Sequence, residues 1–231
     1  MGERPYTVLS CGISLDGYLD AATPERLVLS NDADLRRVDA VRAHSDAILV
    51  GATTVRHDNP RLLVRAPELR AERRRRGLCE SPTKVTVTES GCLDRTSNFF
   101  ATGDSEKLVY CAGRTAGRVR NGLEGVATVV DAGQPVDLAE VVSDLHARGV
   151  GRLMVEGGGR IHTQFLTQAL ADELHLVVAP FFVGDARAHR FVGAGAFPWN
   201  PSHRAHLAET RQIGDVVLLR YALSPRFVEA P

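Results

Sequence analysis

The stretch Val155-Glu156-Gly157-Gly158-Gly159 combines residue types that could bind an anion and carry out acid–base chemistry beside it. Glycines between a strand and a helix let backbone N–H groups approach an anion, and the first turn of the helix adds a partial positive charge. A carboxylate just before such a loop can reach whatever lies next to the anion. The spacing therefore predicts a site for a dinucleotide or a phosphorylated substrate.

The glycine loop taken alone leaves two interpretations open. It is not the G-x-G-x-x-G fingerprint, and no acidic residue with a ribose-binding role follows roughly 20 positions later. The loop is therefore also compatible with a tight turn that only glycine can make.

Composition narrows the class of protein. The 231 residues contain 28 Lys plus Arg and 28 Asp plus Glu, so the formal net charge is zero and nucleic-acid binding is not favoured. The basic run from Arg73 to Arg76 lacks interleaved aromatic residues, which favours a solvated loop or helix face. No apolar run approaches the roughly 20 residues of a membrane helix. The N-terminus has no secretory pattern, so we expect a cytoplasmic protein.

The metal-ligating residue types are scattered. The four cysteines are irregularly spaced without a Cys-x-x-Cys pair, and the eight histidines form no ligand pattern. We therefore expect neither a metal site nor a disulfide framework.

Short strand patterns alternate with helical ones, which is typical of an α/β fold. Strands are predicted at 6–13, 47–50, 84–88, 107–111, 127–130, 152–155 and 173–179, with helices at 32–44, after 51, from 137 and after 159. Residues 66–82 are expected to form a loop. Segments 203–213 and 216–222, joined by Gly214-Asp215, predict a terminal hairpin. We expect three α/β/α layers with a mostly parallel central sheet and this antiparallel hairpin, in a single domain over 1–231 with its core at about 6–222.

Six ordered segments together resemble a known family, the reductase domain of riboflavin biosynthesis. This domain is the C-terminal half of bifunctional RibD and belongs to the dihydrofolate-reductase-like superfamily. The matching segments are Ser14–Tyr18, Arg42–Val50, Ala52–Val55, Asp58–Leu62, Val155–Ile161 and Leu170–Leu174 running into Ala179–Gly184. They extend over almost the whole chain, from near residue 8 to near residue 222. The deaminase motifs of bifunctional RibD, His-x-Glu and Pro-Cys-x-x-Cys, are absent, so we expect the reduction step alone.

The resemblance implies an activity and a set of site residues. The family uses NADPH to reduce the ribosyl group of 5-amino-6-(5-phosphoribosylamino)uracil to ribityl, and a homodimer is expected. By resemblance the cofactor-binding residues are Cys11, Gly12, Thr54, Asp58, Ser90, Gly158, Gly159, Arg160, Ile161, His162, Thr163 and Gln164. The substrate-binding residues are Arg42, Leu62, Arg65 and Glu156. Arginine suits a phosphate, although Arg42 and Arg65 are also compatible with surface ion pairs, and Asp58 with a turn cap.

The proposed chemistry is hydride transfer to C1′ of the ribosylamino group, through an open-chain imine. Protonation of the imine nitrogen assists such a reduction, and Glu156 and Asp58 are the candidate acids, directly or through water. Arg114 is a candidate for reading the 2′-phosphate of NADPH.

The chain departs from the family pattern at Arg26, Val28, Asn59 and Phe181. These departures leave two alternatives open. One is a same-fold reductase of dihydrofolate or another pterin-like heterocycle, and the other is a non-catalytic nucleotide-binding module.

Overall fold

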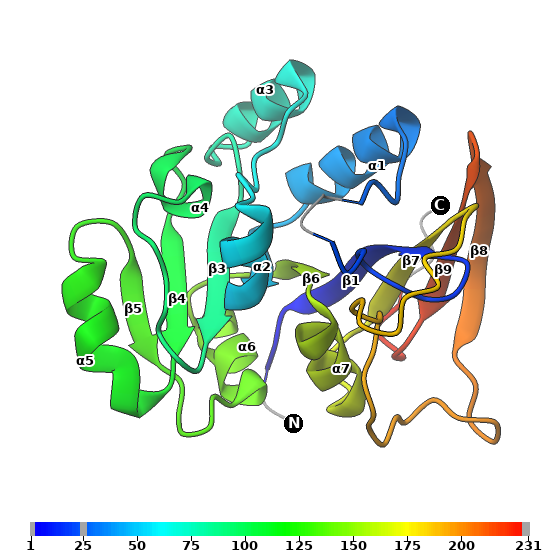
Figure 1. Cartoon of the computed structure of the whole chain (residues 1–231). Helices are drawn as coiled ribbons and strands as arrows, with labels where there is room; N and C mark the ends of the chain where they lie inside the picture. Colours follow the sequence, from blue (N-terminus) through cyan, green and yellow to red (C-terminus); the bar gives the residue numbers. More distant parts are fainter. Residues whose placement is uncertain (1–2, 24–26, 228–231) are drawn as a thin grey trace. The chain divides into compact units, whose positions relative to one another are not determined.

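The computed structural model describes residues 3–23 and 27–227. Along the chain the elements are β1 (Tyr6–Ser14), α1 (Asp32–Ala43), β2 (Ala47–Gly51), α2 (Ala52–Asp58), α3 (Pro67–Arg75), β3 (Thr83–Thr88), α4 (Asn98–Ala101), β4 (Lys107–Cys111), α5 (Gly113–Gly122), β5 (Thr128–Asp131), α6 (Leu138–Ala147), β6 (Arg152–Gly157), α7 (Gly159–Thr167), β7 (Glu173–Ala179), β8 (His206–Ile213) and β9 (Val216–Ala222) (Figure 1).

Two compact units divide the chain, and each is described by itself. The first unit contains Asp39–Met154 with the residues before Tyr6, and the second contains Tyr6–Val38 and Val155–Pro231. The boundary falls within β6, so this strand continues from one unit into the other. The single domain expected over 1–231 stays a prediction.

The first unit is built on a parallel sheet with the strand order β5-β4-β3-β2. All five residues of β2 are buried, and so is β4 from Leu108 onward. Such continuous apolar runs are typical of strands covered on both faces. Helix α5 packs against β4 and β5, next to which it lies in Figure 1. The carboxyl ends of β2 and β3 meet at the same edge, so the residues that follow them become neighbours.

The second unit combines parallel and antiparallel pairing in the order β1-β7-β9-β8. Strand β1 runs parallel to β7, whereas β9 is antiparallel to both β7 and β8. The hairpin turn predicted between β8 and β9 is present, with Gly214 at φ 63°. A core cluster of Leu29, Val177, Ala179, Val216 and Leu218 lies under the hairpin.

The predicted α/β class is confirmed, with mostly parallel pairing and an antiparallel C-terminal hairpin. The loop expected over residues 66–82 is wrong in part, because Pro67–Arg75 forms α3. Pro67 occupies the first turn, where its missing N–H costs nothing. The side chain of Arg73 is buried and donates to the carbonyls of Ala43, Ser45 and Cys79, so this arginine does not belong to a solvated face.

Candidate active site

The predicted anion loop forms the entrance to α7. Gly157 and Gly158 have φ angles of 118° and 79°, a region that side chains other than glycine rarely adopt. Gly158 is the N-cap of α7 and offers no side chain to cap the helix. The first intrahelical bond runs from the N–H of His162 to the carbonyl of Gly158. The N–H groups of Gly159, Arg160 and Ile161 therefore have no helical acceptor, as an anion site requires.

Gly159 is required for a different reason, namely close packing against a second segment. A Cβ at this position would lie 2.4 Å from the carbonyl oxygen of Arg190. One turn later, Thr163 Oγ1 donates to the carbonyl of Gly159 and accepts the N–H of Gly193. The segment 190–193 is thus held against the first turn of α7.

The side chains of this turn differ in what they can offer a ligand. Ile161 and His162 are buried, so only their backbone groups can contribute to binding at the surface, whereas Arg160 and Gln164 are exposed. His162 packs against Phe191, with ring centroids 5.4 Å apart, and neither ring nitrogen makes a hydrogen bond of normal geometry. Burial lowers the pKa of His162 to about 4, and the nearby carbonyl of Val155 opposes this shift only partly. His162 is therefore neutral at physiological pH.

Three further predicted residues lie on strands of the second unit. Glu156 is on β6, directly before Gly157, and is half-buried. Cys11 and Gly12 lie on β1, opposite Leu176 and Val177 of β7. A Cβ on Gly12 would lie 3.0 Å from both Cβ and the carbonyl oxygen of Leu29, so the strand passes close to that residue. Burial raises the pKa of the Cys11 thiol, which keeps it protonated.

In the first unit, the structure brings together the predicted substrate residues Arg42, Leu62 and Arg65. Arg42 NH1 donates to the carbonyl of Leu63 at 3.1 Å. The carboxylate of Asp39, one turn earlier on α1, accepts the N–H groups of Arg65 and Ala66 at 2.8 Å each. Leu62 is buried with a positive φ of 48°, and the side chain of Arg65 is exposed. Asp39 thus fixes the backbone from which Arg65 extends.

Asp39 itself was not among the predicted site residues. It is 4% exposed, whereas a carboxylate on a helix is ordinarily expected at the surface. The only sequence signal was its position on α1, one turn before Arg42.

The predicted cofactor residues of this unit follow the ends of β2 and β3. Thr54 and Asp58 lie on α2, which starts directly after β2, and Ser90 lies in the turn after β3. Arg56 of α2 joins the two segments, because its NH1 donates to the carbonyl of Cys92 at 3.1 Å. All three predicted residues therefore lie at one edge of the parallel sheet.

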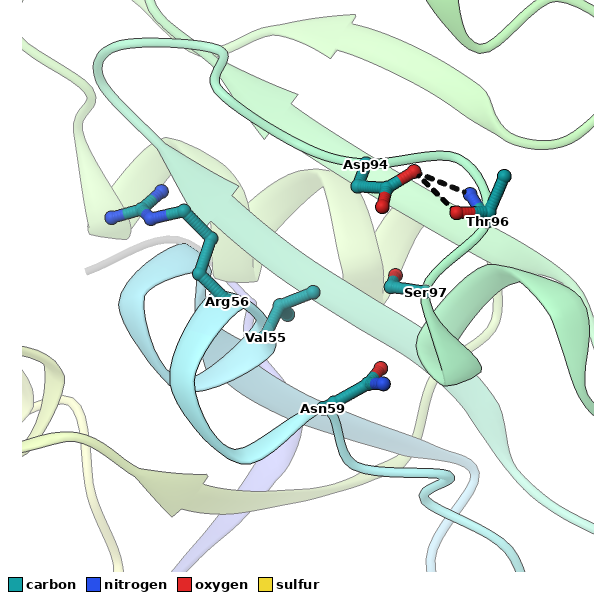
Figure 2. Close-up of a pocket in the computed structure, with 6 residues that line it drawn as sticks. All are labelled: Val55, Arg56, Asn59, Asp94, Thr96 and Ser97. Carbon is teal, nitrogen blue, oxygen red and sulfur yellow. Dashed lines mark hydrogen bonds between the residues drawn. The ribbon is translucent and has the colours of Figure 1, made fainter. Parts of the chain in front are cut away.

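A polar pocket of about 240 Å³ lies beside them, lined by Val55, Arg56, Asn59, Asp94, Thr96 and Ser97 (Figure 2). Asp94 accepts hydrogen bonds from the N–H and the hydroxyl of Thr96, which lower the pKa of its carboxyl. The hydroxyl of Ser97 is buried without a hydrogen-bond partner. This pocket was not predicted, since its residues come from the end of α2 and from the separate segment 94–97.

Three of the four departures from the family pattern lie in the described residues. Asn59 adopts a left-handed conformation (φ 43°) that ends α2, and its Oδ1 accepts the N–H of Asn98 at 2.6 Å. Phe181 packs on the core cluster under the hairpin, and Val28 is 67% exposed. Arg26 lies outside the described residues.

Within residues 3–23 and 27–227, no group of three or more His, Cys, Asp or Glu side chains could hold a metal ion. No helix in those same ranges has the length and apolar character needed to cross a membrane.

Comparison with known proteins agrees with the resemblance. The model of the RibD C-terminal domain family matches residues 5–219. An Archaeoglobus fulgidus protein named 2,5-diamino-6-ribosylamino-4(3H)-pyrimidinone 5′-phosphate reductase is 36% identical over 183 residues, covering 78% of this chain and 83% of the relative. A Methanothermobacter thermautotrophicus protein of the same name is 33% identical over 224 residues, covering 95% and 99%.

Solved structures show the same fold. A pyrimidine reductase-like protein of Corynebacterium diphtheriae superposes with a TM-score of 0.77 at 21% identity, covering 94% of this chain and 91% of the other. Acinetobacter baumannii RibD gives a TM-score of 0.76 at 23% identity, covering 95% of this chain but 58% of its own. The match to the family model and to the two archaeal relatives decides the family: the chain belongs to the RibD C-terminal domain family and is a reductase of riboflavin biosynthesis.

Proposed function

We propose that this protein is an NADPH-dependent reductase of a phosphorylated ribosylaminopyrimidine. Its substrate is 2,5-diamino-6-ribosylamino-4(3H)-pyrimidinone 5′-phosphate, whose ribosyl group becomes a ribityl group. The observation that carries the cofactor assignment is the entrance to α7, where consecutive glycines precede N–H groups without helical acceptors. Such an entrance fits the diphosphate of a dinucleotide.

The choice of pyrimidine rests on the relatives. The two archaeal proteins, over most of whose length this chain extends, carry the name of the diaminopyrimidinone reductase. The family resemblance alone indicated the uracil form, which has lost one amino group. Both compounds carry the same phosphoribosylamino group, so the uracil form is the second candidate substrate.

Each set of residues has a role in this proposal. The turn from Gly158 to Gln164 binds the cofactor diphosphate, and Thr54, Asp58 and Ser90 bind further along the cofactor, with Cys11 and Gly12 beside it. Arg42 and Arg65 bind the substrate phosphate, because a guanidinium pairs with phosphate through two parallel hydrogen bonds. Leu62 and Glu156 contact the pyrimidine-bearing part.

When bound, NADPH supplies a hydride for C1′ of the open-chain imine form of the substrate. Glu156 or Asp58 holds the proton that the imine nitrogen receives, directly or through water. The remaining contribution of the protein is orientation, since holding donor and acceptor carbons in contact removes much of the barrier.

The deciding experiment follows the absorbance of NADPH with three substrates supplied separately. These are the diaminopyrimidinone phosphate, its uracil counterpart and dihydrofolate. We expect turnover of the diaminopyrimidinone to exceed that of the other two, with a product that has gained two hydrogens by mass spectrometry. Turnover of dihydrofolate alone would establish the same-fold alternative instead. Binding of NADPH without turnover of any of the three would establish a non-catalytic module.

Two further properties are proposed, namely a homodimer, which the family resemblance implies, and a cytoplasmic location, which the amino-acid sequence predicts. Light scattering coupled to size-exclusion chromatography tests the first, and fractionation of cells that express the protein tests the second.

A further inference from the structure

Two arginines converge on the turn after β3 from different helices. Arg56 of α2 donates to the carbonyl of Cys92, and Arg118 of α5 donates to the carbonyl of Ser90. The two acceptors are two residues apart in one turn, and all of these residues belong to the first unit. Both guanidinium groups therefore lie at the same short segment, which also carries the side chain of Ser90.

The turn itself is rigidly placed. Gly91 has a φ of 66°, and a Cβ there would lie 2.4 Å from Cγ2 of Val119 on α5. The N–H of Gly91 donates to Thr88 Oγ1 at 3.0 Å. The N–H of Cys92 donates to Ser90 Oγ at 3.3 Å, which leaves the hydroxyl hydrogen of Ser90 able to donate to a ligand.

The hydrogen-bond acceptors of the two arginines are all neutral. Besides the carbonyl of Cys92, Arg56 contacts only the hydroxyl of Thr53 at 3.1 Å among the hydrogen bonds of the described residues. By contrast, Arg114, the arginine singled out from the sequence, has NH2 3.9 Å from Oε2 of the neighbouring carboxylate Glu89. Hydrogen bonds to neutral acceptors therefore orient both guanidinium groups, and within the described residues neither forms a salt bridge, although Asp94 lines the same pocket as Arg56. A guanidinium has five donors, so each arginine retains several for an anion.

An anion at this turn also has room for the group that carries it. The pocket lined by Val55, Arg56, Asn59, Asp94, Thr96 and Ser97 lies beside the turn, and Figure 2 shows the guanidinium of Arg56 pointing away from Asn59, Asp94 and Ser97. This guanidinium donates to the carbonyl of Cys92 in the turn. The pocket's volume of about 240 Å³ and its polar lining suit a nucleoside. The buried hydroxyl of Ser97 offers such a group an unused hydrogen-bond partner.

We infer that Arg56 and Arg118 bind the 2′-phosphate of NADPH and are the residues by which this protein selects NADPH over NADH. The inference rests on the proposed function, which makes a nicotinamide dinucleotide the cofactor. The two dinucleotides differ only by this phosphate, a dianion that suits two guanidinium groups and a hydroxyl. The adenosine that carries it occupies the pocket beside Arg56.

The test replaces each arginine by glutamine, which retains part of the hydrogen bonding but removes the charge. Calorimetry with the whole chain measures binding of adenosine 2′,5′-bisphosphate and adenosine 5′-monophosphate without substrate. Steady-state kinetics then give kcat/KM for NADPH and for NADH. Arg120→Gln is the matched control, since Arg120 is exposed on the same helix as Arg118 and donates no hydrogen bond to the turn in the described residues.

We expect Arg56→Gln and Arg118→Gln each to weaken binding of the bisphosphate about tenfold or more, as for loss of one charge-assisted contact. The NADPH-to-NADH ratio of kcat/KM should fall by a similar factor, because both variants lose more with NADPH than with NADH, while the ratio in the Arg120→Gln control stays unchanged. Equal losses for both cofactors would overturn the inference, because they would indicate damage to the turn. A raised KM for the pyrimidine with unchanged cofactor preference would overturn it too, by assigning the cations to the substrate phosphate.

Failure of the proposed function gives a different result. If the unmodified protein binds neither dinucleotide, the cofactor assignment and the inference both fail. If it binds NADPH and NADH equally well, the proposed reductase remains and only the inference fails.

Discussion

The guanidinium of Arg37 on α1 lies 3.1 Å from Nδ1 of His175 on β7. A guanidinium only donates, so Nδ1 accepts and the ring proton is assigned to Nε2. Nε2 in turn lies 2.6 Å from Oε1 of Glu173, an oxygen that also receives two hydrogen bonds from Arg220. A neutral histidine therefore connects a helix to the carboxylate that ties β7 to β9.

This arrangement predicts a loss of stability in acid. Burial lowers the pKa of His175 below its ordinary value of 6.5, against the opposing effect of Glu173. As the pH falls through 6.5, the unfolded chain binds a proton that the folded chain excludes, so the free energy of unfolding decreases. His175→Gln keeps one acceptor and one donor but does not titrate. Urea unfolding from pH 7 to pH 5 should show a shallower decline in this variant, whereas exposed His206→Gln should retain the full decline. An unaltered decline in His175→Gln would contradict the prediction.

The contact between Gly159 and Arg190 predicts that adding one methyl group at position 159 destabilises the fold. In Gly159→Ala the new Cβ would meet a backbone carbonyl at 2.4 Å, so segment 190–191 must move. We expect a loss of about 1–3 kcal/mol in the free energy of unfolding, as for other overpacked sites. Gly117→Ala is the control, because it lies inside α5 with nothing within 4 Å. That change should stabilise the protein by about 0.5–1 kcal/mol. Denaturant midpoints of both variants provide the comparison, and equal midpoints would show that the contact is not tight.

Lys84 predicts a gain of stability in base. It is fully buried on β3, where its Nζ donates to the carbonyls of Phe99 and Thr102. Burial, with a smaller effect of Lys107, lowers its pKa from 10.5 to about 8. Between these values the unfolded chain retains a proton that the folded chain has lost, so stability should rise with pH from 8 to 10.

Unfolding measured across this range tests the effect of Lys84. Lys84→Met should lack the rise. At neutral pH its free energy of unfolding should be lower by about 1–3 kcal/mol, because the carbonyls of Phe99 and Thr102 lose their hydrogen-bond donor. Lys107→Met should move the rise to higher pH, because a neighbouring positive charge is gone. A rise that persists in Lys84→Met would have to come from another group.

Elements with local signals could be predicted from the sequence. Asn31 accepts the N–H groups of Ala33 and Asp34 at the start of α1, and Asn59 ends α2 in a left-handed conformation. Helix α5 gave no such signal, because its N-cap is Ala112 and it contains internal glycines. Helix α3 was missed because its charged sequence has no apolar stripe, and what fixes it is the burial of Arg73 against carbonyls far along the chain.

The same distinction holds for the candidate site. The glycine turn before α7 is local, so its conformation could be anticipated from three consecutive glycines. The support of Arg65 by Asp39 joins residues 26 positions apart, and that of Ser90 by Arg118 joins residues 28 positions apart. Neither spacing leaves a periodic signal, so only the folded chain reveals them.

Glu156 and Asp58 are the two carboxylates proposed to hold the proton for the imine nitrogen. Replacing each by its neutral amide should have different effects on turnover and on NADPH binding. Glu156 is on β6 directly before the glycine turn, and its proposed partner is the substrate. Glu156→Gln should therefore lower kcat about 100-fold or more, as for loss of a general acid, while the Kd of NADPH changes little. Asp58 is proposed to contact the cofactor as well, so Asp58→Asn should weaken both turnover and NADPH binding.

The pH dependence of kcat/KM then identifies the proton donor, because replacing that residue removes the limb of the profile that it controls. Exposed Glu140→Gln on α6 is the control for loss of one negative charge. If Glu156→Gln chiefly weakens NADPH binding and leaves kcat intact, the carboxylate belongs to the cofactor side of the site. The proton would then have to come from Asp58 or from water, and the profile of Asp58→Asn would distinguish these two sources.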